Sequence, residues 1–295
     1  MIEFVPAARS ASKARIALVG PSGSGKTYTA LTLATRLADN VAVVDTERGR
    51  ASLYEGVNGW RFHRHNPQSF SPQSLTEALA VAGGNEFGCI VVDSLSHYWM
   101  GVDGMLEQAD RRAKGGNSFS GWKEVRPDER RMLDALASYP GHVIVTLRAK
   151  TEYVIDEDAR GKKVPRKVGL KPEQREGIEY EFDVVGDLDL DNTLTVSKSR
   201  IPDLSRAVVP QPGPELADTI RSWLEDGQET PDALRYRDRA LSMSMESADE
   251  LLTLYREVER GGLLGAAVLT DDGTPTSLGD LIVALGKAAK QRATE

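Results

Sequence analysis

Apolar positions are distributed along the chain in two patterns. Four short continuous apolar runs occupy residues 16–19, 41–44, 89–92 and 143–145. Runs of this length are typical of buried parallel strands, whose two faces are both covered. In the segment 30–38, apolar residues instead recur every three or four positions, which predicts a helix with one buried face. The chain is therefore expected to form an α/β core with a mostly parallel central sheet flanked by helices.

Weaker patterns add further elements to this core. Residues 60–62 are expected to add a strand. Ser71 and Pro72 open a second helix, because serine caps a helix and proline suits its first turn, and Gly83-Gly84 ends it. Polar and apolar residues alternate over 193–196, which predicts a strand, and residues 179–185 are expected to form another.

The last part of the chain has a different organisation. A proline-rich piece at residues 210–214 marks a boundary before one more helix, and residues 228–231 form a second linker. Three helical stretches follow, at residues 231–243, 247–260 and 276–290. The chain thus divides into an N-terminal lead-in (1–14), a large core (15–227) and a small C-terminal helical domain (228–295).

A phosphate-binding loop lies between the first apolar run and the first predicted helix. Glycines let backbone N–H groups surround a phosphate at the positive end of the helix dipole, and the pattern G-x-x-x-x-G-K-[ST] occurs here in its required strand-to-helix context. Lys26 is expected to reach the β- and γ-phosphates of ATP, and the Thr27 hydroxyl to bind Mg²⁺. The alternative is a glycine-rich surface turn. The candidate ATP ligands are Gly20, Pro21, Ser22, Gly23, Ser24, Gly25, Lys26, Thr27 and Tyr28.

Two of the apolar runs end in carboxylates. The run 89–92 is followed by Asp93, which fits the second motif of phosphate-loop ATPases and predicts a Mg²⁺ ligand. Many ATPases of the AAA+ type place their water-activating glutamate directly after that aspartate, but this chain has Ser94 there. The run 41–44 leads into Asp45-Thr46-Glu47 at the same edge of the sheet, so Glu47 is the candidate general base. The alternative for Glu47 is a solvent-facing loop acid.

Taken together, these motifs resemble the RecA family of ATPases. The shared pieces are the phosphate loop, the strand ends at Glu47 and Asp93, and the segment 143–150. The resemblance implies a RecA-like P-loop core in which Glu47 activates water. It also implies that Tyr54 stacks on adenine, although a lone aromatic residue can equally be a packing residue. Thr146 stands where the family has a γ-phosphate-sensing glutamine, a departure that weakens the expected coupling of ATP to DNA. Arg148 and Lys150 are candidates for part of that role, and the alternative is that they are ordinary surface cations.

Two basic residues late in the chain extend the resemblance. RecA-like filaments carry two cations that reach the γ-phosphate of the neighbouring subunit, and Lys198 and Arg200 match them in position. This role implies an ATPase that is active as a homo-oligomeric ring or filament. The alternative is a basic turn at the end of a strand.

A narrower resemblance concerns phage-encoded ATPases of single-strand annealing and recombination. It is carried by three pieces, namely residues 45–49, 93–97 and 179–183. It implies an ATP- and Mg²⁺-dependent protein that acts on single-stranded DNA. The C-terminal helices carry no recognisable chemistry, and a protein partner such as a single-strand-binding protein is the hypothesis for them.

Two basic segments are the candidates for binding that DNA. One is a predicted loop over 100–121, and the other is a predicted hairpin formed by 153–155 and 163–164; six basic and no acidic residues lie between positions 160 and 171. Cations for phosphates and aromatic rings for bases are what a sequence-tolerant single-strand groove needs. The competing interpretation is a flexible loop and a solvated hairpin. The candidate DNA ligands are Arg111, Arg112, Lys114, Arg160, Lys162, Lys163, Arg166 and Lys167.

Composition and charge limit which partners and which cellular compartment are expected. The net charge of −7 argues against a protein whose whole surface coats nucleic acid. The single cysteine, Cys89, excludes an intrachain disulfide, and no apolar run approaches the roughly 18 residues of a membrane span, so a cytoplasmic protein without a membrane partner is expected. Two other functions remain open: a motor or replication accessory that acts on a protein partner, and a nucleotide or metabolite kinase.

Overall fold

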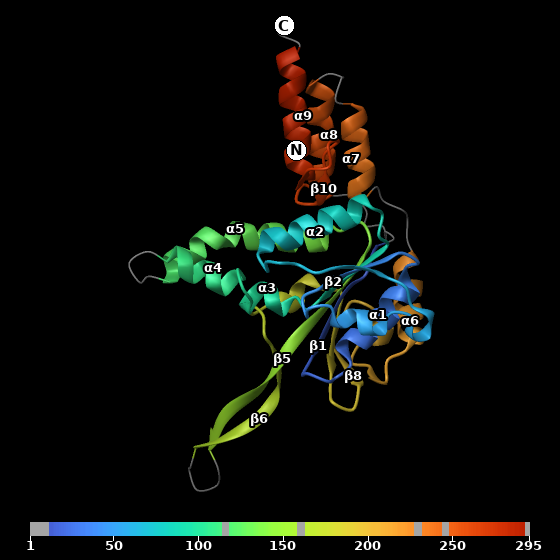
Figure 1. The fold of residues 1–295 in the computed structure, drawn as a ribbon, viewed down its shortest axis with the longest axis vertical. Helices are drawn as coiled ribbons and strands as arrows, with labels where there is room; N and C mark the ends of the chain where they lie inside the picture. The colour runs from blue at the N-terminus through green and yellow to red at the C-terminus, as the bar shows by residue number, and fades with distance from the viewer. Residues whose placement is uncertain (1–11, 114–117, 158–162, 227–231, 244–247, 293–295) are drawn as a thin grey trace.

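The computed structural model describes residues 12–113, 118–157, 163–226, 232–243 and 248–292. Its centre is a nine-stranded sheet with the order β3-β2-β4-β5-β1-β7-β8-β9, to which β6 adds by pairing with β5 (Figure 1). The strands are β1 (Arg15–Gly20), β2 (Val41–Asp45), β3 (His63–His65), β4 (Cys89–Asp93), β5 (His142–Glu157), β6 (Lys163–Pro172), β7 (Val184–Leu188), β8 (Thr193–Ser199) and β9 (Val208–Pro210).

Six neighbouring strands, from β3 through β7, run parallel, and β8 and β9 continue the sheet in antiparallel fashion. This arrangement confirms the predicted mostly parallel α/β core. Strand β5 lies between β1, which leads into the phosphate loop, and β4, which ends in Asp93. The carboxyl ends of β1, β2, β4 and β5 therefore meet at one edge of the sheet.

Helices cover both faces of the sheet. They are α1 (Lys26–Leu37), α2 (Pro72–Gly84), α3 (Ser96–Met100), α4 (Met105–Arg112), α5 (Ser118–Ala137) and α6 (Pro214–Glu225). Alternate residues of β1 point to opposite faces: Ile16 and Leu18 belong to the core under α1 and α6, whereas Ala17 and Val19 belong to the core under α2 and α5. The result is a three-layer core, with α6 as part of it.

Four short 3₁₀ turns connect the main elements: η1 (Arg50–Tyr54), η2 (Val57–Gly59), η3 (Ile178–Glu181) and η4 (Pro202–Leu204). They correct two of the expected strands. The strand near position 60 begins at His63, because Trp60 is buried in the core under α1. The stretch expected to form a strand over 179–185 begins instead with η3, and β7 starts only at Val184.

The segment 100–121 is largely helical where it is described, not a loop. Helix α4 packs on α5 through Met105, Ala109 and Val125, and Glu107 and Arg111 lie one turn apart on its exposed face. Gly121 permits the close approach, since a Cβ there would lie 1.9 Å from the carbonyl oxygen of Ala109. The expected hairpin after Lys150 is confirmed by β5 and β6, and it is longer than its apolar pattern indicated.

The C-terminal domain contains α7 (Ala233–Ser242), α8 (Ala248–Arg260) and α9 (Leu278–Arg292), which match the three predicted helices. A small hairpin of β10 (Ala267–Leu269) and β11 (Pro275–Ser277) lies between α8 and α9 and was not predicted. The domain has its own apolar core, and its β10–β11 hairpin packs against α2 (Figure 1). Among the described residues, no helix has the length and apolarity that crossing a bilayer requires.

Candidate active site

The phosphate loop has the backbone of an anion cradle. Gly23 and Gly25 have φ angles of 82° and 81°, in the left-handed region that favours glycine. Helix α1 begins directly after Gly25 with no side-chain cap and no acid in its first turn, so its first N–H groups remain open to a ligand. Ser24 is fully buried, and its hydroxyl has no partner in the described part of the protein. An orphan donor beside open amides fits a phosphate group.

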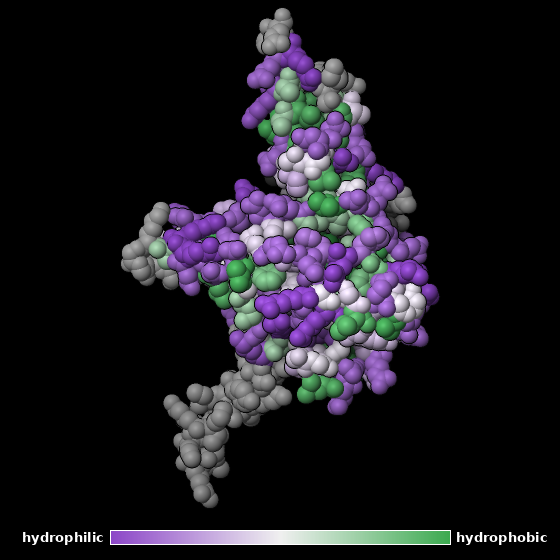
Figure 2. Space-filling model, in the orientation of Figure 1, coloured by the Kyte–Doolittle hydropathy of each residue, from purple (hydrophilic) through white to green (hydrophobic). Residues whose placement is uncertain are grey.

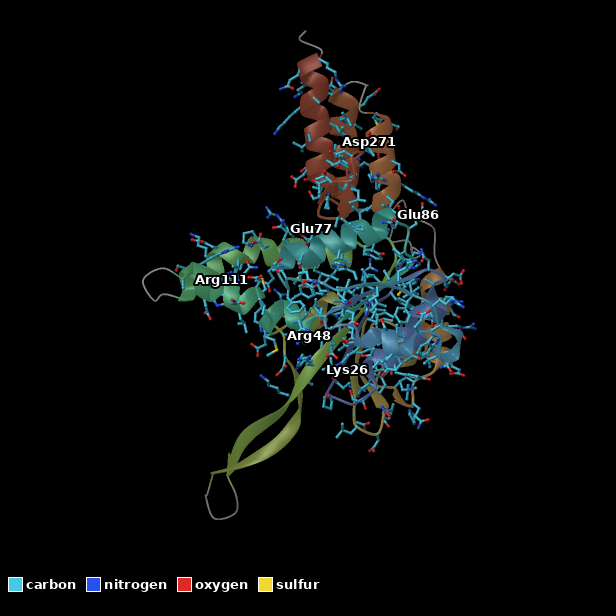
Figure 3. The ribbon with its side chains drawn as sticks, in the orientation of Figure 1. Lys26, Arg48, Glu77, Glu86, Arg111 and Asp271 are labelled. Atoms are coloured by element: carbon cyan, nitrogen blue, oxygen red, sulfur yellow. The ribbon has the colours of Figure 1, made fainter. Side chains whose placement is uncertain are left out.

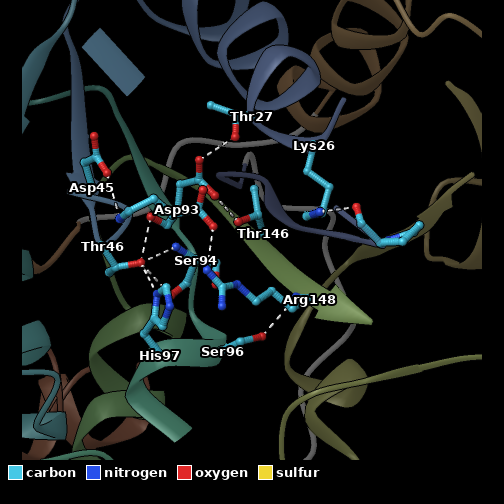
Figure 4. Close-up of polar contacts among 12 residues, drawn as sticks. Lys26, Thr27, Asp45, Thr46, Asp93, Ser94, Ser96, His97, Thr146 and Arg148 are labelled. Atoms are coloured by element: carbon cyan, nitrogen blue, oxygen red, sulfur yellow. Dashed lines mark hydrogen bonds and ion pairs between the residues drawn. The ribbon is translucent and has the colours of Figure 1, made fainter. Parts of the chain in front are cut away.

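Lys26 is folded back on this cradle. Its Nζ donates to the carbonyl oxygen of Pro21 at 2.7 Å (Figure 4). Burial lowers the pKa of Lys26, while the nearby carboxylates Asp93 and Glu47 raise it. The ammonium group therefore lies close to the two carboxylates that the sequence assigned to this edge.

Asp93 is the centre of a small hydrogen-bonded cluster. One carboxylate oxygen accepts from the Thr27 hydroxyl at 2.6 Å, and the other accepts from the Thr146 hydroxyl. Burial raises the pKa of Asp93, and these two hydrogen bonds oppose the shift. Thr27 and Asp93 thus stand together as Mg²⁺ ligands would, and Thr146, expected to sense the γ-phosphate, lies against the same carboxylate.

Strand pairing brings the end of β2 to this cluster. Asp45 lies opposite Asp93 in the parallel register, and its carboxylate accepts from the backbone N–H of Glu47 and of Ala51. The Thr46 hydroxyl donates to the Asp93 carbonyl and accepts from the N–H of Ser94 at 2.6 Å. Buried side chains therefore shape both strand ends and fix the start of the turn that carries Glu47.

Glu47 is held by an arginine that the sequence did not assign to it. Its Oε1 accepts from Nη2 of Arg148 at 2.8 Å, and the two side chains are 28% and 42% exposed. His97 lies nearby, where burial and the charge of Arg148 lower its pKa and Glu47 raises it. No local pattern in the sequence predicts this ion pair, because its partners are 101 positions apart.

A cavity of about 860 Å³ opens beside the phosphate loop. Tyr28, Trp60 and Asn192 are among its lining residues, and Gly25 connects it to the cradle. Tyr54 does not line the cavity; its ring packs edge-on against Tyr28, with the ring centroids 6.1 Å apart. Tyr28 therefore lines the cavity and Tyr54 packs against Tyr28, and contact of either ring with a nucleotide base stays a prediction.

Lys198 lies in β8 and Arg200 follows it, and β7, β1 and β5 separate β8 from β4 and Asp93. Lys198 donates to the carbonyls of Glu179 and Phe182, at 2.8 and 2.7 Å, and its Nζ lies 5.6 Å from the centroid of the Tyr180 ring. Burial lowers the pKa of Lys198. Arg200 pairs with Asp183 at 3.3 Å. Their expected contact with a γ-phosphate would require a second copy of the chain and stays a prediction.

The candidate DNA ligands fall into two groups. Arg111 pairs with Asp103, and Arg112 pairs with Asp128 at 3.3 Å, so both are engaged by acids on their own domain. Figure 3 places Arg111 on the projecting part of the α4–α5 pair, away from Lys26. Lys163, Arg166 and Lys167 lie in β6. Lys114, Arg160 and Lys162 lie outside the described residues.

Helix α5 carries three cations that the sequence reasoning missed. Lys123, Arg126 and Arg130 are exposed and follow the i, i+3, i+7 spacing of one helix face. No acidic partner is found for them among the described residues. Most of the surface of the α4–α5 pair seen in Figure 2 is hydrophilic, with apolar residues among it, and Leu106 and Phe119 are 39% and 71% exposed. The helical spacing of the three cations in the sequence would have been enough to predict a basic face on this helix.

The comparison with known proteins agrees with this geometry. Residues 12–208 match the model of a family described as an AAA domain. No curated protein matches the chain significantly. The matched segment begins just before β1, ends at the start of β9, and contains the phosphate loop, Glu47, Asp93 and Thr146. The chain therefore belongs to the AAA domain family and is a P-loop ATPase.

Proposed function

We propose that the protein is a RecA-like ATPase that hydrolyses ATP while acting on single-stranded DNA, in homologous recombination or strand annealing of the phage type. The observation that carries this proposal is the course of β5. The strand places Thr146 against Asp93 and Arg148 against Glu47, and it then continues without interruption into the hairpin with β6. One continuous strand thus joins the proposed hydrolysis site to the most basic segment of the chain.

The side chains have distinct roles in this proposal. Thr27 and Asp93 would hold Mg²⁺, which when bound would supply positive charge beside the phosphate oxygens. Lys26 leaves the carbonyl of Pro21 to contact the phosphates. Glu47 accepts the proton of the attacking water, since Ser94 stands where an AAA+ glutamate would otherwise be. Tyr28 and the cavity beside it accommodate the nucleoside.

The DNA part of the proposal is supported by charge. The hairpin segment contributes Lys163, Arg166 and Lys167, and helix α5 presents Lys123 and its two neighbouring arginines, in a chain whose net charge is −7. Localised cations of this kind suit a phosphate backbone, and sequence-tolerant binding of single strands needs little more than such a groove and aromatic rings. A homo-oligomer would align these surfaces along a strand and bring Lys198 and Arg200 to a neighbouring nucleotide.

The test is an ATPase assay with and without single-stranded DNA. Wild-type protein should be stimulated by DNA, and Lys26→Ala and Glu47→Gln should each lower turnover by about a hundredfold or more. DNA binding measured across a salt series should weaken steeply, since released counterions scale with the phosphates contacted. Robust turnover in Glu47→Gln would remove Glu47 as the base.

A protein-directed motor is the second candidate, favoured by the acid pairing of Arg111 and Arg112. It predicts ATPase activity that single-stranded DNA leaves unchanged. A kinase predicts a phosphorylated acceptor in product analysis, and it leaves Lys198 and Arg200 without a role.

A further inference from the structure

Arg148 occupies the junction between the hydrolysis site and the hairpin. In the central sheet it pairs in register with Gly20, the first residue of the phosphate loop. The next residue, Ala149, already pairs with Pro172 in the hairpin. Arg148 is therefore the last residue of β5 inside the sheet, and its side chain reaches the proposed base Glu47.

The backbone around Arg148 is tied to both sides of this junction. Its N–H donates to the Ser96 hydroxyl at 2.9 Å, and its carbonyl accepts from the N–H of Glu173 at 2.6 Å. The side chain of Gln174 donates to the carbonyl of Leu95 at 3.3 Å. Both arms of the hairpin are thereby connected to the turn that follows Asp93, so a displacement of the hairpin is transmitted to Arg148.

We propose that Arg148 is a positioning residue that restrains Glu47 until a polyanion binds the hairpin, and that this restraint makes ATP hydrolysis depend on DNA. The inference rests on the proposed function. While Oε1 of Glu47 accepts from Arg148, the ion pair occupies part of the carboxylate and holds the side chain in one orientation, so Glu47 is not free to turn toward an attacking water. A phosphate backbone on the hairpin competes for the same guanidinium group, because phosphate and carboxylate both match its paired donors.

The exposure of the ion pair suits such an exchange. With 42% and 28% of the two side chains exposed, the pair is solvated enough to open at a modest free-energy cost. Lys150, the next cation on β5, pairs instead with Glu173 at 2.7 Å and has no contact with Glu47. Among the described residues, the connection to the base thus runs through Arg148.

The experiment compares basal and DNA-stimulated steady-state ATPase in wild type, Arg148→Ala and Arg148→Lys. Arg239→Ala is the matched control, because Arg239 forms a 2.8 Å pair with Glu257 of similar exposure in the C-terminal domain. Arg148→Ala should raise basal kcat about fivefold, as expected for losing a partly exposed ion pair, with KM for ATP unchanged. At saturating DNA, the variant and wild type should turn over at similar rates. Arg148→Lys should return the basal rate toward wild type, and the control should match wild type throughout.

The possible outcomes separate this inference from the proposed function. If Arg148→Ala lowers basal kcat or raises KM for ATP, Arg148 supports the chemistry or contacts the nucleotide, and the restraint is wrong. If its basal and stimulated rates both equal those of wild type, the restraint is also wrong, while DNA-stimulated hydrolysis stands. If wild type is not stimulated by DNA, the DNA proposal fails, and a raised basal rate in Arg148→Ala still supports restraint of Glu47.

Discussion

Asp93 is a buried carboxylate, and burial makes its charged form unfavourable. It is only 4% exposed, and burial raises its pKa. The pKa of Asp93 in the folded protein lies above its ordinary value of 3.8, which we take for the unfolded chain. Between these two pKa values the folded protein binds more protons than the unfolded chain does, so the free energy of unfolding falls as pH rises through this range. A buried carboxylate that lowers stability is a common cost of a functional site, and it fits the proposed metal-binding role of Asp93.

Replacing Asp93 by asparagine should therefore stabilise the nucleotide-free protein near neutral pH, by about 1 kcal/mol, while abolishing Mg²⁺-dependent hydrolysis. The amide can still bond Thr27 and Thr146, so hydrogen bonding is preserved. Urea unfolding at a series of pH values checks this: the advantage of Asp93→Asn should shrink as pH falls through the raised pKa of Asp93. An advantage independent of pH would refute the charge explanation.

Two glycines of the phosphate loop are needed for different reasons. A Cβ at Gly20 would lie 2.6 Å from the carbonyl oxygen of Leu188, whereas a Cβ at Gly23 meets nothing within 4 Å, although its φ is 82°. Gly23→Ala should thus cost only about 1 kcal/mol of stability for its left-handed backbone, and Gly20→Ala about 2–3 kcal/mol for the overlap. Denaturant unfolding of both variants checks the order, and equal costs would contradict it.

At the scale of elements, the sequence was most informative where a pattern is local. The phosphate loop, the strand ends at Glu47 and Asp93, and the three C-terminal helices all follow from residues adjacent in the chain. The helices inside 100–121 did not, because their apolar faces become visible only when Met105 meets Val125. The pairing of Glu47 with Arg148 depends on strand order, which local patterns do not encode.

The 3₁₀ turn η3 lies where a strand was expected, and one side chain binds several of the carbonyl groups around it. Lys198 donates to the carbonyls of Glu179, Tyr180 and Phe182. Lys198→Met keeps the apolar stem but leaves these carbonyls without a cationic partner, and it should cost about 2 kcal/mol of stability. Arg200→Ala should cost under about 1 kcal/mol, because the Arg200 side chain of its ion pair with Asp183 is 63% exposed.

Unfolding in dilute solution, where any oligomer would dissociate, measures the stability of both variants. If Lys198→Met is as stable as wild type, the three hydrogen bonds contribute nothing, and a role of Lys198 in a neighbouring subunit gains weight. Arg200→Ala then tests that role separately, through loss of ATPase activity at high protein concentration without loss of stability.

At the scale of the whole molecule, two compact units meet through close backbone approaches. Gly84 of α2 lies against Leu269 of β10, and Gly265 lies against Asp134 of α5. The C-terminal unit has a separate apolar core, whereas Ala267 and Leu269 belong to the core under α2 and α5. Each unit therefore retains a core when the contact between them is lost.

Gly265→Val should separate the two units without unfolding either. A Cβ at this position would lie 2.7 Å from Cβ of Asp134, an atom that cannot move without shifting α5. Gly286→Val is the matched control, since a Cβ there meets nothing within 4 Å. We expect the first variant to show faster proteolysis between the units and a larger radius of gyration, with basal ATPase activity retained because the site lies at the opposite edge of the sheet. If Gly265→Val remains as compact and protease-resistant as the control, the docked arrangement does not depend on this contact. If the variant loses ATPase activity while both units stay folded, the C-terminal domain acts on the hydrolysis site through α2 and α5.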